Sequence, residues 1–360
     1  MRLIFDAHLD LGWSAVSFNR DLTRSVEEIR RQEEGMTDEP SRGHNTLTFP
    51  ELKNAGVAVC VTTLLARAGP EQTKKLANKR TDLDFATQSI AYSQAHGQLA
   101  YYRLMEQQGY LQQIRKASEL ETFWKQRAGD ANQPLGYILS MEGADPIVSP
   151  LQVEEWWEKG LRALGPAHYG RGQYAYGTGV DGPLSENGIE LLREMQKLGM
   201  ILDVTHLSDT SMAKALDIFS GRVLASHHNC RTLVPNDRQI SDEQIKRLIQ
   251  RDAVIGVALD AWMLYPGWVR GTTSPSVLSL ASVADHIDHV CQLAGNTRHS
   301  AIGSDLDGGF GTEQTPRDLD TIADLQKLDG ILKSRGYSNA DIDAIFHGNW
   351  LRFFREALPK

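Results

Sequence analysis

The chain has 360 residues, of which 41% are hydrophobic and 23% are charged, and its formal net charge is −8 at pH 7. This composition is typical of a globular enzyme with a large core. The acidic balance argues against a nucleic-acid-binding protein, which needs a basic face. The chain contains no apolar run as long as the roughly 18 residues that a membrane-spanning helix needs.

The beginning of the chain and its cysteines predict the cellular compartment. An apolar strand is expected within the first few residues, which leaves no room for a signal peptide. The three cysteines, Cys60, Cys230 and Cys291, show no CxxC spacing, so neither a disulfide framework nor a thiolate metal site is predicted. We therefore expect a cytoplasmic protein.

Apolar segments alternate with helical patterns along the whole chain. Strands are predicted at residues 2–9, 57–65, 136–141, 161–164, 200–205, 222–226, 253–259 and 300–304. Helices are predicted at 84–107, 119–127, 150–159, 185–198, 241–251 and 282–293, from a cap at Asp209, and near 319–333, 339–346 and 349–357. Nearly continuous apolar strands separated by helices indicate a parallel sheet. Eight such units predict a single α/β domain over residues 1–360, a (β/α)8 TIM-type barrel with extra C-terminal helices.

An open, doubly wound sheet is the alternative architecture. It would not collect polar residues so evenly from the first strand to the last.

Two segments lie outside the regular pattern. Residues 19–45 are polar and are expected to form a short exposed helix and a loop. Residues 170–182 contain five glycines and are expected to form a functional loop, which is no phosphate site because GxxxxGK[ST] is absent.

Seven of the eight predicted strands end in residues that bind metals or transfer protons. These are His8 with Asp10, Glu142, His168, His206, His227, Asp260 and Asp305. In a (β/α)8 barrel the carboxyl ends of the strands meet at one rim, where the active site lies. One catalytic zinc needs only three protein ligands, whereas five with a bridging carboxylate suit two ions about 3.5–4 Å apart. Such a pair hydrolyses amide or related acyl bonds, and the absence of HExxH disfavours a single-zinc metalloprotease.

Six short motifs occur in a distinctive order along the chain. They are Asp6-Ala7-His8-Leu9-Asp10, Met141-Glu142-Gly143, Asp203-Val204-Thr205-His206-Leu207-Ser208, Ser226-His227-His228-Asn229, Arg238-Gln239-Ile240-Ser241-Asp242-Glu243 and Gly303-Ser304-Asp305-Leu306-Asp307-Gly308. In this order they resemble the renal (membrane) dipeptidase family of zinc peptidases, over residues 1 to about 356. Members of that family have a (β/α)8 barrel and a binuclear zinc site.

The resemblance implies a role for each matching residue. Two Zn²⁺ ions would be bound, one by His8 and Asp10 and the other by His206 and His227, with Glu142 and a hydroxide as bridges. Asp305 would be the general base that orients this hydroxide and the acid that protonates the leaving amine. His168 would donate to the developing oxyanion and so contact the substrate. Arg238 would pair with the free carboxylate of the substrate.

The implied activity is zinc-dependent hydrolysis of dipeptides with a free C-terminal carboxylate, with tolerance of D-residues at that position, by a homodimer. One alternative is a binuclear amidohydrolase that acts on another amide or peptide-like metabolite. Amidohydrolases of one type carry a His-x-His motif on the first strand and a lysine after a middle strand. This chain has His-x-Asp on its first strand and no such lysine, which counts against that type. The other alternative is a non-catalytic zinc barrel that serves as a binding module, which Asp305 and the glycine-rich loop disfavour.

Several assignments choose between near neighbours. His227 is preferred to His228, Asp305 to Asp307, and Arg238 to Arg231. Asp203 is expected to be a packing or hydrogen-bonding partner rather than a ligand. The chain departs from the family pattern at Leu9, at Trp13, around His168 and at Asp260, which changes the expected pocket wall but no metal ligand. Asp260 is predicted to bind a cationic group of the substrate, either an ammonium or a basic side chain.

Overall fold

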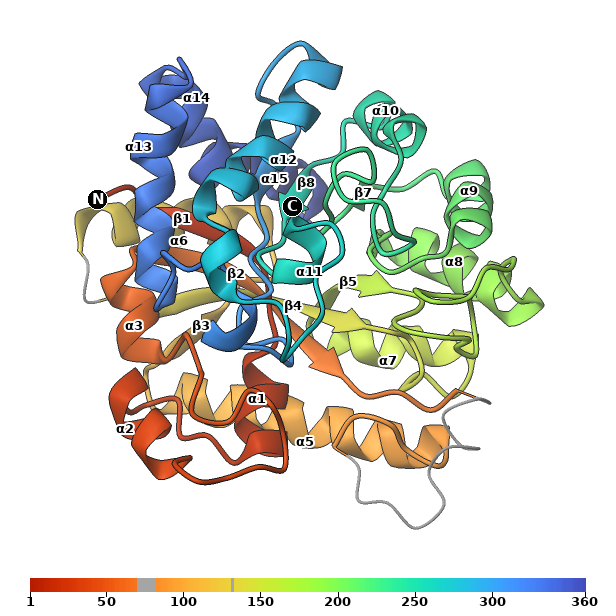
Figure 1. The fold of residues 1–360 in the computed structure, drawn as a ribbon. Coiled ribbons are helices and arrows are strands. Elements are labelled where there is room, and N and C mark those ends of the chain that lie inside the picture. Colours follow the sequence, from red (N-terminus) through yellow and green to blue (C-terminus); the bar gives the residue numbers. More distant parts are fainter. Residues whose placement is uncertain (70–81, 131–132) are drawn as a thin grey trace.

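A computed structural model describes residues 1–69, 82–130 and 133–360 as an α/β fold around a curved parallel sheet (Figure 1). The strands are β1 Ile4–Leu9, β2 Val57–Leu65, β3 Leu111–Gln113, β4 Leu135–Glu142, β5 Leu161–Gly165, β6 Ile201–Asp203, β7 Val223–Leu224, β8 Ile255–Val257 and β9 Ser300–Ile302. All eight predicted strands are present, and several are shorter than predicted. β3 was missed because its three residues include two glutamines and so form no apolar run.

The strand order is that of consecutive βα units. Strands β1, β2, β4, β5, β6 and β7 lie side by side in parallel, β3 pairs with β4, and β8 pairs with β9. A parallel bridge between Ala225 and Ile255 connects the end of β7 to β8. At the other edge, the Ser304 N–H donates to Asp6 Oδ1 at 2.8 Å. The parallel α/β fold is therefore confirmed, while complete closure of an eight-stranded barrel remains a prediction.

Helices follow most strands and cover the sheet (Figure 1). They are α1 Leu11–Phe18, α2 Val26–Gln32, α3 Phe49–Asn54, α5 Gln88–Gln107, α6 Ala117–Gly129, α7 Val153–Glu158, α8 Glu186–Leu198, α9 Asp209–Ile218, α10 Asp242–Gln250, α11 Ala261–Leu264, α12 Leu280–Ala294, α13 Lys327–Ser334, α14 Asn339–Asp343 and α15 Asn349–Ala357. Short 3-10 turns lie at Pro150–Gln152, Pro275–Val277, Thr312–Gln314 and Ile322–Gln326, and a π turn lies at Ala344–Gly348. Among the described residues, no helix has the length and apolarity that crossing a bilayer requires.

The helix ends follow local chemistry. Ser185 caps α8 by accepting from the Gly188 N–H, and Gly199 ends the helix with a φ of 73°, which agrees with the helix predicted over 185–198. The predicted cap of α9 is wrong by one residue. Ser208 accepts from the Ser211 N–H, and Asp209 is the first helical residue. Both residue types cap helices well, so the sequence alone did not separate them.

The C-terminal helix closes the end of the sheet opposite the polar rim. The Phe5 ring of β1 stacks on Phe354 of α15 with centroids 5.2 Å apart. The Trp350 indole donates to the carbonyl oxygen of Ile302 at 2.8 Å. Because these aromatic side chains are buried, this end of the molecule is packed core, and the carboxyl ends of the strands are left to form the site.

The polar segment 19–45 differs from its prediction. It contains α2 as expected, but Arg20 and Glu33 are only 4% exposed. Arg20 donates to both carboxylate oxygens of Glu33 at 2.8 and 3.0 Å, and Arg42 donates to the same carboxylate at 2.8 Å. The prediction of an exposed helix and loop is therefore wrong for these residues, because paired charges can be buried where isolated ones cannot.

Candidate active site

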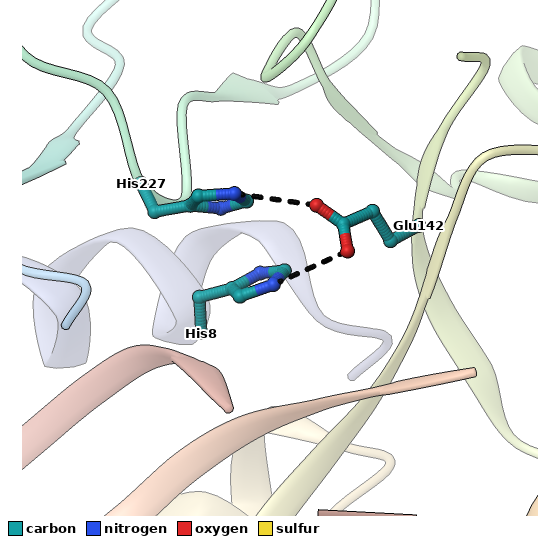
Figure 2. A group of neighbouring side chains, drawn as sticks. All are labelled: His8, Glu142 and His227. Carbon is teal, nitrogen blue, oxygen red and sulfur yellow. Dashed lines mark ion pairs between the residues drawn. The ribbon is translucent and has the colours of Figure 1, made fainter. Parts of the chain in front are cut away.

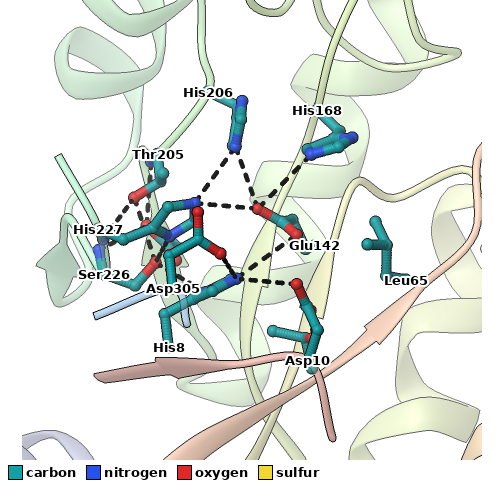
Figure 3. Close-up of polar contacts among 12 residues, drawn as sticks. His8, Asp10, Leu65, Glu142, His168, Thr205, His206, Ser226, His227 and Asp305 are labelled. Atoms are coloured by element: carbon teal, nitrogen blue, oxygen red, sulfur yellow. Dashed lines mark hydrogen bonds and ion pairs between the residues drawn. The ribbon is translucent and has the colours of Figure 1, made fainter. Parts of the chain in front are cut away.

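The polar residues at the strand ends converge on one cavity of about 170 Å³ at the rim of the sheet (Figure 3). His8 lies in β1, Glu142 ends β4, and Asp10 directly follows β1. The other predicted members each follow their strands by three residues: His168, His206, His227, Asp260 and Asp305. The cavity is lined by Asp10, Trp13, Arg67, Glu142, His168, Tyr169, His206, His227, Arg238, Asp260 and Asp305, among others. The structure therefore brings all the predicted site residues that end strands into one place, with His8 directly beneath the cavity wall.

Glu142 lies at the centre of this group (Figure 2). Its Oε1 lies 3.1 Å from His206 Nε2 and 3.2 Å from His227 Nε2, whereas its Oε2 lies 3.5 Å from His8 Nε2. The two oxygens of one carboxylate therefore face different imidazoles. This is the arrangement that a carboxylate bridging two cations requires.

Two further carboxylates lie close to His8. The Nε2 atom of His8 is 3.7 Å from Asp10 Oδ2 and 3.8 Å from Asp305 Oδ1. Asp10 also accepts a hydrogen bond from the Thr63 hydroxyl, which orients the carboxylate. Burial, followed by the charges of Asp10 and Glu142, raises the pKa of Asp305 well above its usual range, although His8 opposes this shift. A cation bound among these carboxylates would offset their mutual repulsion.

Hydroxyl groups contact the imidazoles of His206 and His227 at Nδ1, the ring nitrogen that faces away from Glu142. His206 Nδ1 lies 3.0 Å from Thr178 Oγ1, and His227 Nδ1 lies 2.9 Å from Ser226 Oγ. With Nδ1 engaged in this way, Nε2 of each ring points toward the cavity. Partners of this kind fix the tautomer and the orientation of metal-binding histidines. Thr178 lies in the glycine-rich segment 170–182, which thus supports the site directly.

The donor atoms fit a divalent metal. His8 Nε2 and Glu142 Oε1 are buried without a hydrogen-bond partner among the described residues. His206 Nε2 and His227 Nε2 lie only 3.2 Å apart, and burial lowers the pKa of both rings well below the usual value, which keeps them neutral. Three groups have ligand atoms within 4.8 Å of one another: His8, Glu142 and His227; Glu142, His168 and His206; and His8, Asp10 and Asp305. Nitrogen and oxygen donors of this kind suit zinc or a similar ion.

Two site residues have a strained backbone. His206 has a φ of 67° and Asp305 a φ of 60°, in the left-handed region that residues other than glycine rarely adopt. The turn at His206 is held by Asp203, whose Oδ1 accepts from the Thr205 N–H at 2.9 Å and the Ser226 N–H at 3.2 Å. The prediction that Asp203 is a hydrogen-bonding partner is confirmed. Strain of this kind is often concentrated at functional sites.

The structure separates the pairs of near neighbours. His227 faces Glu142, whereas His228 is buried outside the cavity lining. Asp305 lines the cavity, whereas Asp307 Oδ1 accepts from the Thr46 N–H and hydroxyl at 2.7 and 2.8 Å.

Arg238 and Arg231 are in different situations. Arg238 is 1% exposed, its Nη2 donates to the His227 carbonyl oxygen at 2.9 Å, and its Nη1 has no hydrogen-bond partner among the described residues. Arg231 instead forms a pair of 2.7 Å bonds with Asp209 near the surface. Of these two residues, Arg238 therefore has bonding capacity left for a ligand in the cavity.

Two further predicted residues lie in the cavity wall. His168 places its Nε2 3.9 Å from Glu142 Oε1. Asp260 Oδ2 accepts from the Trp262 indole at 2.8 Å, and burial raises the pKa of its carboxyl to about 7. Both side chains can therefore contact a substrate that reaches Glu142.

Sequence reasoning missed Arg67 as a member of the cavity wall. The second predicted strand was the one strand without a reactive residue at its end, and Arg67 lies just two residues beyond that strand. That gap in the pattern was the signal that could have identified it. Asp6 was also given no role, although its Oδ1 accepts from the N–H groups of His8 and Ser304 and so connects β1 to the end of β9.

Comparison with known families identifies the group to which the chain is related. The family described as "Membrane dipeptidase (Peptidase family M19)" matches residues 2–358. The chain belongs to this family. The resemblance found in the sequence is thereby confirmed, and so is the prediction of the enzyme class, metallo-dipeptidase.

Individual members of the membrane dipeptidase family are distant relatives. "Dipeptidase aclJ" of Aspergillus oryzae is 30% identical over 220 residues, which cover 60% of this chain and 50% of that protein. An "Uncharacterized protein in pqqA 5'region" of Klebsiella pneumoniae is 26% identical over 232 residues, 61% of this chain and 82% of that protein. The match spans about half the length of aclJ and of other curated dipeptidases.

A solved structure shares the fold. It is a metallo peptidase from Rhodobacter sphaeroides, described as liganded with a phosphinate mimic of the dipeptide L-Ala-D-Ala. It superposes with a TM-score of 0.77 at 21% identity, and the alignment covers 99% of both chains.

Proposed function

We propose that this protein is a dipeptidase with two zinc ions, acting on short substrates that have a free C-terminal carboxylate. The observation that carries the proposal is the buried Arg238 Nη1, which has no hydrogen-bond partner among the described residues and belongs to a residue lining the same cavity as Glu142 and His206. A guanidinium matches a carboxylate as a bidentate partner. The small volume of the cavity, about 170 Å³, favours a short substrate.

The carboxylate geometry supports the expected division of the ligands. His8 and Asp10 lie on the Oε2 side of Glu142, and His206 and His227 lie on the Oε1 side. One ion on each side would make Glu142 the bridge. When bound, such a pair supplies a hydroxide near neutral pH and polarises the substrate carbonyl.

The residues of the chain have complementary tasks in the reaction. Arg238 holds the substrate carboxylate and thereby places the scissile amide next to Glu142. Asp305 accepts the proton of the attacking water and delivers it to the amine nitrogen as the C–N bond breaks, so that no proton is gained or lost overall. His168 donates an N–H to the carbonyl oxygen as negative charge develops there.

Asp260 adds a specificity element at the cavity wall. In its ionised form it would attract the ammonium or a basic side chain of the substrate. The Rhodobacter structure contains a mimic of a dipeptide with a C-terminal D-residue, which supports our proposal that D-residues are tolerated at that position here.

The decisive experiment combines elemental analysis with hydrolysis of a dipeptide panel containing L,L and L,D pairs. We expect two zinc ions per chain and turnover of at least one pair. Two zinc ions without turnover of any dipeptide would favour the amidohydrolase alternative, in which the same donor atoms act on another amide. Retained metal with no hydrolase activity on any amide would favour the binding-module alternative. One ion or none would contradict the bridging role of Glu142.

Three broader proposals accompany this function. We propose that residues 1–360 form a single, closed (β/α)8 domain and that two chains form a dimer, which light scattering coupled to size-exclusion chromatography tests. We also propose a cytoplasmic location, supported by three buried free cysteines, Cys60, Cys230 and Cys291. Fractionation of the native source tests the location.

A further inference from the structure

Arg67 connects a surface carboxylate to a cavity imidazole. Its Nε donates to Asp84 Oδ1 and its Nη2 to Asp84 Oδ2, both at 2.7 Å. Its Nη1 lies 3.3 Å from His168 Nδ1. Backbone bonds fix the pair, since the Arg67 N–H donates to Leu83 O at 2.8 Å and the Phe85 N–H donates to Arg67 O at 2.7 Å. The ion pair with Asp84 and the two backbone hydrogen bonds therefore fix the position of the guanidinium next to the imidazole.

The chemistry of the two groups determines where the imidazole proton lies. A guanidinium is always protonated and has no acceptor, so Arg67 Nη1 is the donor of this contact and His168 Nδ1 is the acceptor. A neutral imidazole carries one N–H, which must then be at Nε2. While Nδ1 accepts from the guanidinium at 3.3 Å it cannot carry a proton of its own, so the ring in this contact is neutral.

The proton-bearing nitrogen points into the site. His168 Nε2 lies 3.9 Å from Glu142 Oε1, on the side of the cavity where His206 also approaches (Figure 3). The His168 and His206 rings make an edge contact with centroids 4.3 Å apart, which further restrains the ring. An N–H fixed at this place can donate to a carbonyl oxygen bound beside Glu142 without reorganisation.

We propose that Arg67, held by Asp84, is a positioning residue that fixes His168 in its Nε2–H tautomer and aims this N–H at the reacting carbonyl oxygen. The inference rests on the proposed function, because it deepens the role of His168 in amide hydrolysis. Three of the five N–H groups of Arg67 are already engaged by Asp84 and His168, so we do not assign the substrate carboxylate to Arg67. Arg238, whose Nη1 has no hydrogen-bond partner among the described residues, takes that role.

The first test reads the tautomer directly in the metal-free protein. ¹⁵N-histidine NMR, with the His168 signal assigned by its loss in His168→Gln, should show a protonated Nε2 and an unprotonated Nδ1 in the wild type. In Arg67→Met the proton should be shared between the two nitrogens. A wild-type His168 with its proton on Nδ1 would overturn the inference, because His168 could then serve only as an acceptor or a metal ligand at Nε2.

The second test reads the consequence for catalysis. Arg67→Met should lower kcat roughly 10- to 100-fold with little change in KM, as for other residues that orient an active-site group. Arg67→Lys, which keeps one charged donor, should recover part of the loss. Arg298→Met is the matched control, since Arg298 forms a similar pair with Asp252 at 3.0 and 3.2 Å and neither residue lines the cavity. If Arg67→Met does not fold, Asp84→Asn loosens the same guanidinium.

A double-variant cycle decides whether Arg67 acts through His168. Arg67→Met should cause no further loss of kcat in a His168→Leu background, in which the N–H to be positioned is absent. Additive losses, or a raised KM with unchanged kcat, would overturn the positioning role and leave the dipeptidase proposal intact. Full activity of His168→Leu, which has no N–H to donate, would overturn both the inference and the donor role of His168 in the proposed function, while turnover of dipeptides by that variant would still support the function itself.

Discussion

The backbone N–H of Asp305 donates a hydrogen bond to the carbonyl oxygen of His8 at 3.2 Å. This bond joins the end of the last strand to the end of the first. It also holds Asp305 Oδ1 at 3.8 Å from His8 Nε2, with Asp305 in a left-handed backbone conformation. The proposed base and a proposed metal ligand thus form one rigid unit, although they are almost 300 residues apart in sequence.

Asp305→Asn should abolish proton transfer while leaving the metal in place. We expect kcat to fall by about 10²–10⁴-fold, the usual contribution of a positioned base, with metal content unchanged by elemental analysis. Asp307→Asn is the informative comparison. Because Asp307 bonds to Thr46 and not to the cavity, it should lower the melting temperature more than the activity of the folded enzyme. The reverse pattern would assign the base to Asp307.

Arg238→Met should weaken binding of substrates with a free C-terminal carboxylate. A lost charged hydrogen bond of about 1.5–3 kcal/mol corresponds to roughly a 10- to 100-fold rise in KM. Dipeptide amides, which lack the carboxylate, should be hydrolysed equally slowly by the wild type and the variant. Arg231→Met serves as the control, because its bonds to Asp209 lie outside the cavity. An equal loss in both variants would indicate a structural effect.

Because of Asp260, we expect the preference of the enzyme for cationic substrates to depend on pH. Its pKa is raised by burial to about 7, so the carboxylate is neutral below this pH and charged above it. The ratio of kcat/KM for a basic dipeptide to that for a neutral dipeptide should therefore rise between about pH 6 and pH 8. Any loss of metal from the enzyme at low pH affects both substrates equally and therefore cancels in this ratio. In Asp260→Asn, which keeps an acceptor for Trp262, the ratio should be flat; identical profiles for the two proteins would contradict the role.

Removal of the metal should destabilise the fold. Without cations, the carboxylates of Asp10, Glu142 and Asp305 share a buried site, and metal bound only to the native state adds to its stability. We expect a chelator to lower the melting temperature by about 5 °C or more. Metal content and activity should also fall together below about pH 6, because histidine must be neutral to bind metal. Full metal occupancy at about pH 5 would contradict this.

Thr178→Val should weaken the metal site without removing a ligand. The Thr178 hydroxyl is 3.0 Å from His206 Nδ1, and losing such a partner typically lowers metal affinity or activity about 10- to 100-fold. Competition with a chelating dye measures the affinity. Thr122→Val on the exposed surface of α6 makes the same chemical change away from the site and should leave the affinity unchanged.

Local patterns in the sequence determined much of this protein. Nearly continuous apolar runs such as 57–65 specify strands buried on both faces, and a serine or glycine at a helix end, as at Ser185 and Gly199, specifies its boundary. A histidine or carboxylate directly after such a strand is carried to the rim by the parallel topology. This is why His8, Glu142 and His206 could be assigned to one site from their place in the sequence.

Only the tertiary structure decided the contacts made between distant segments. Whether Arg20 and Glu33 are exposed depends on their pairing, and their residue types favour the surface. The position of Arg67 beside His168 depends on its bridge and its ion pair with Asp84, a contact that no local pattern encodes. Secondary structure follows from short-range sterics and hydrophobic periodicity, whereas the partner of a polar side chain is set by the packing of the whole fold.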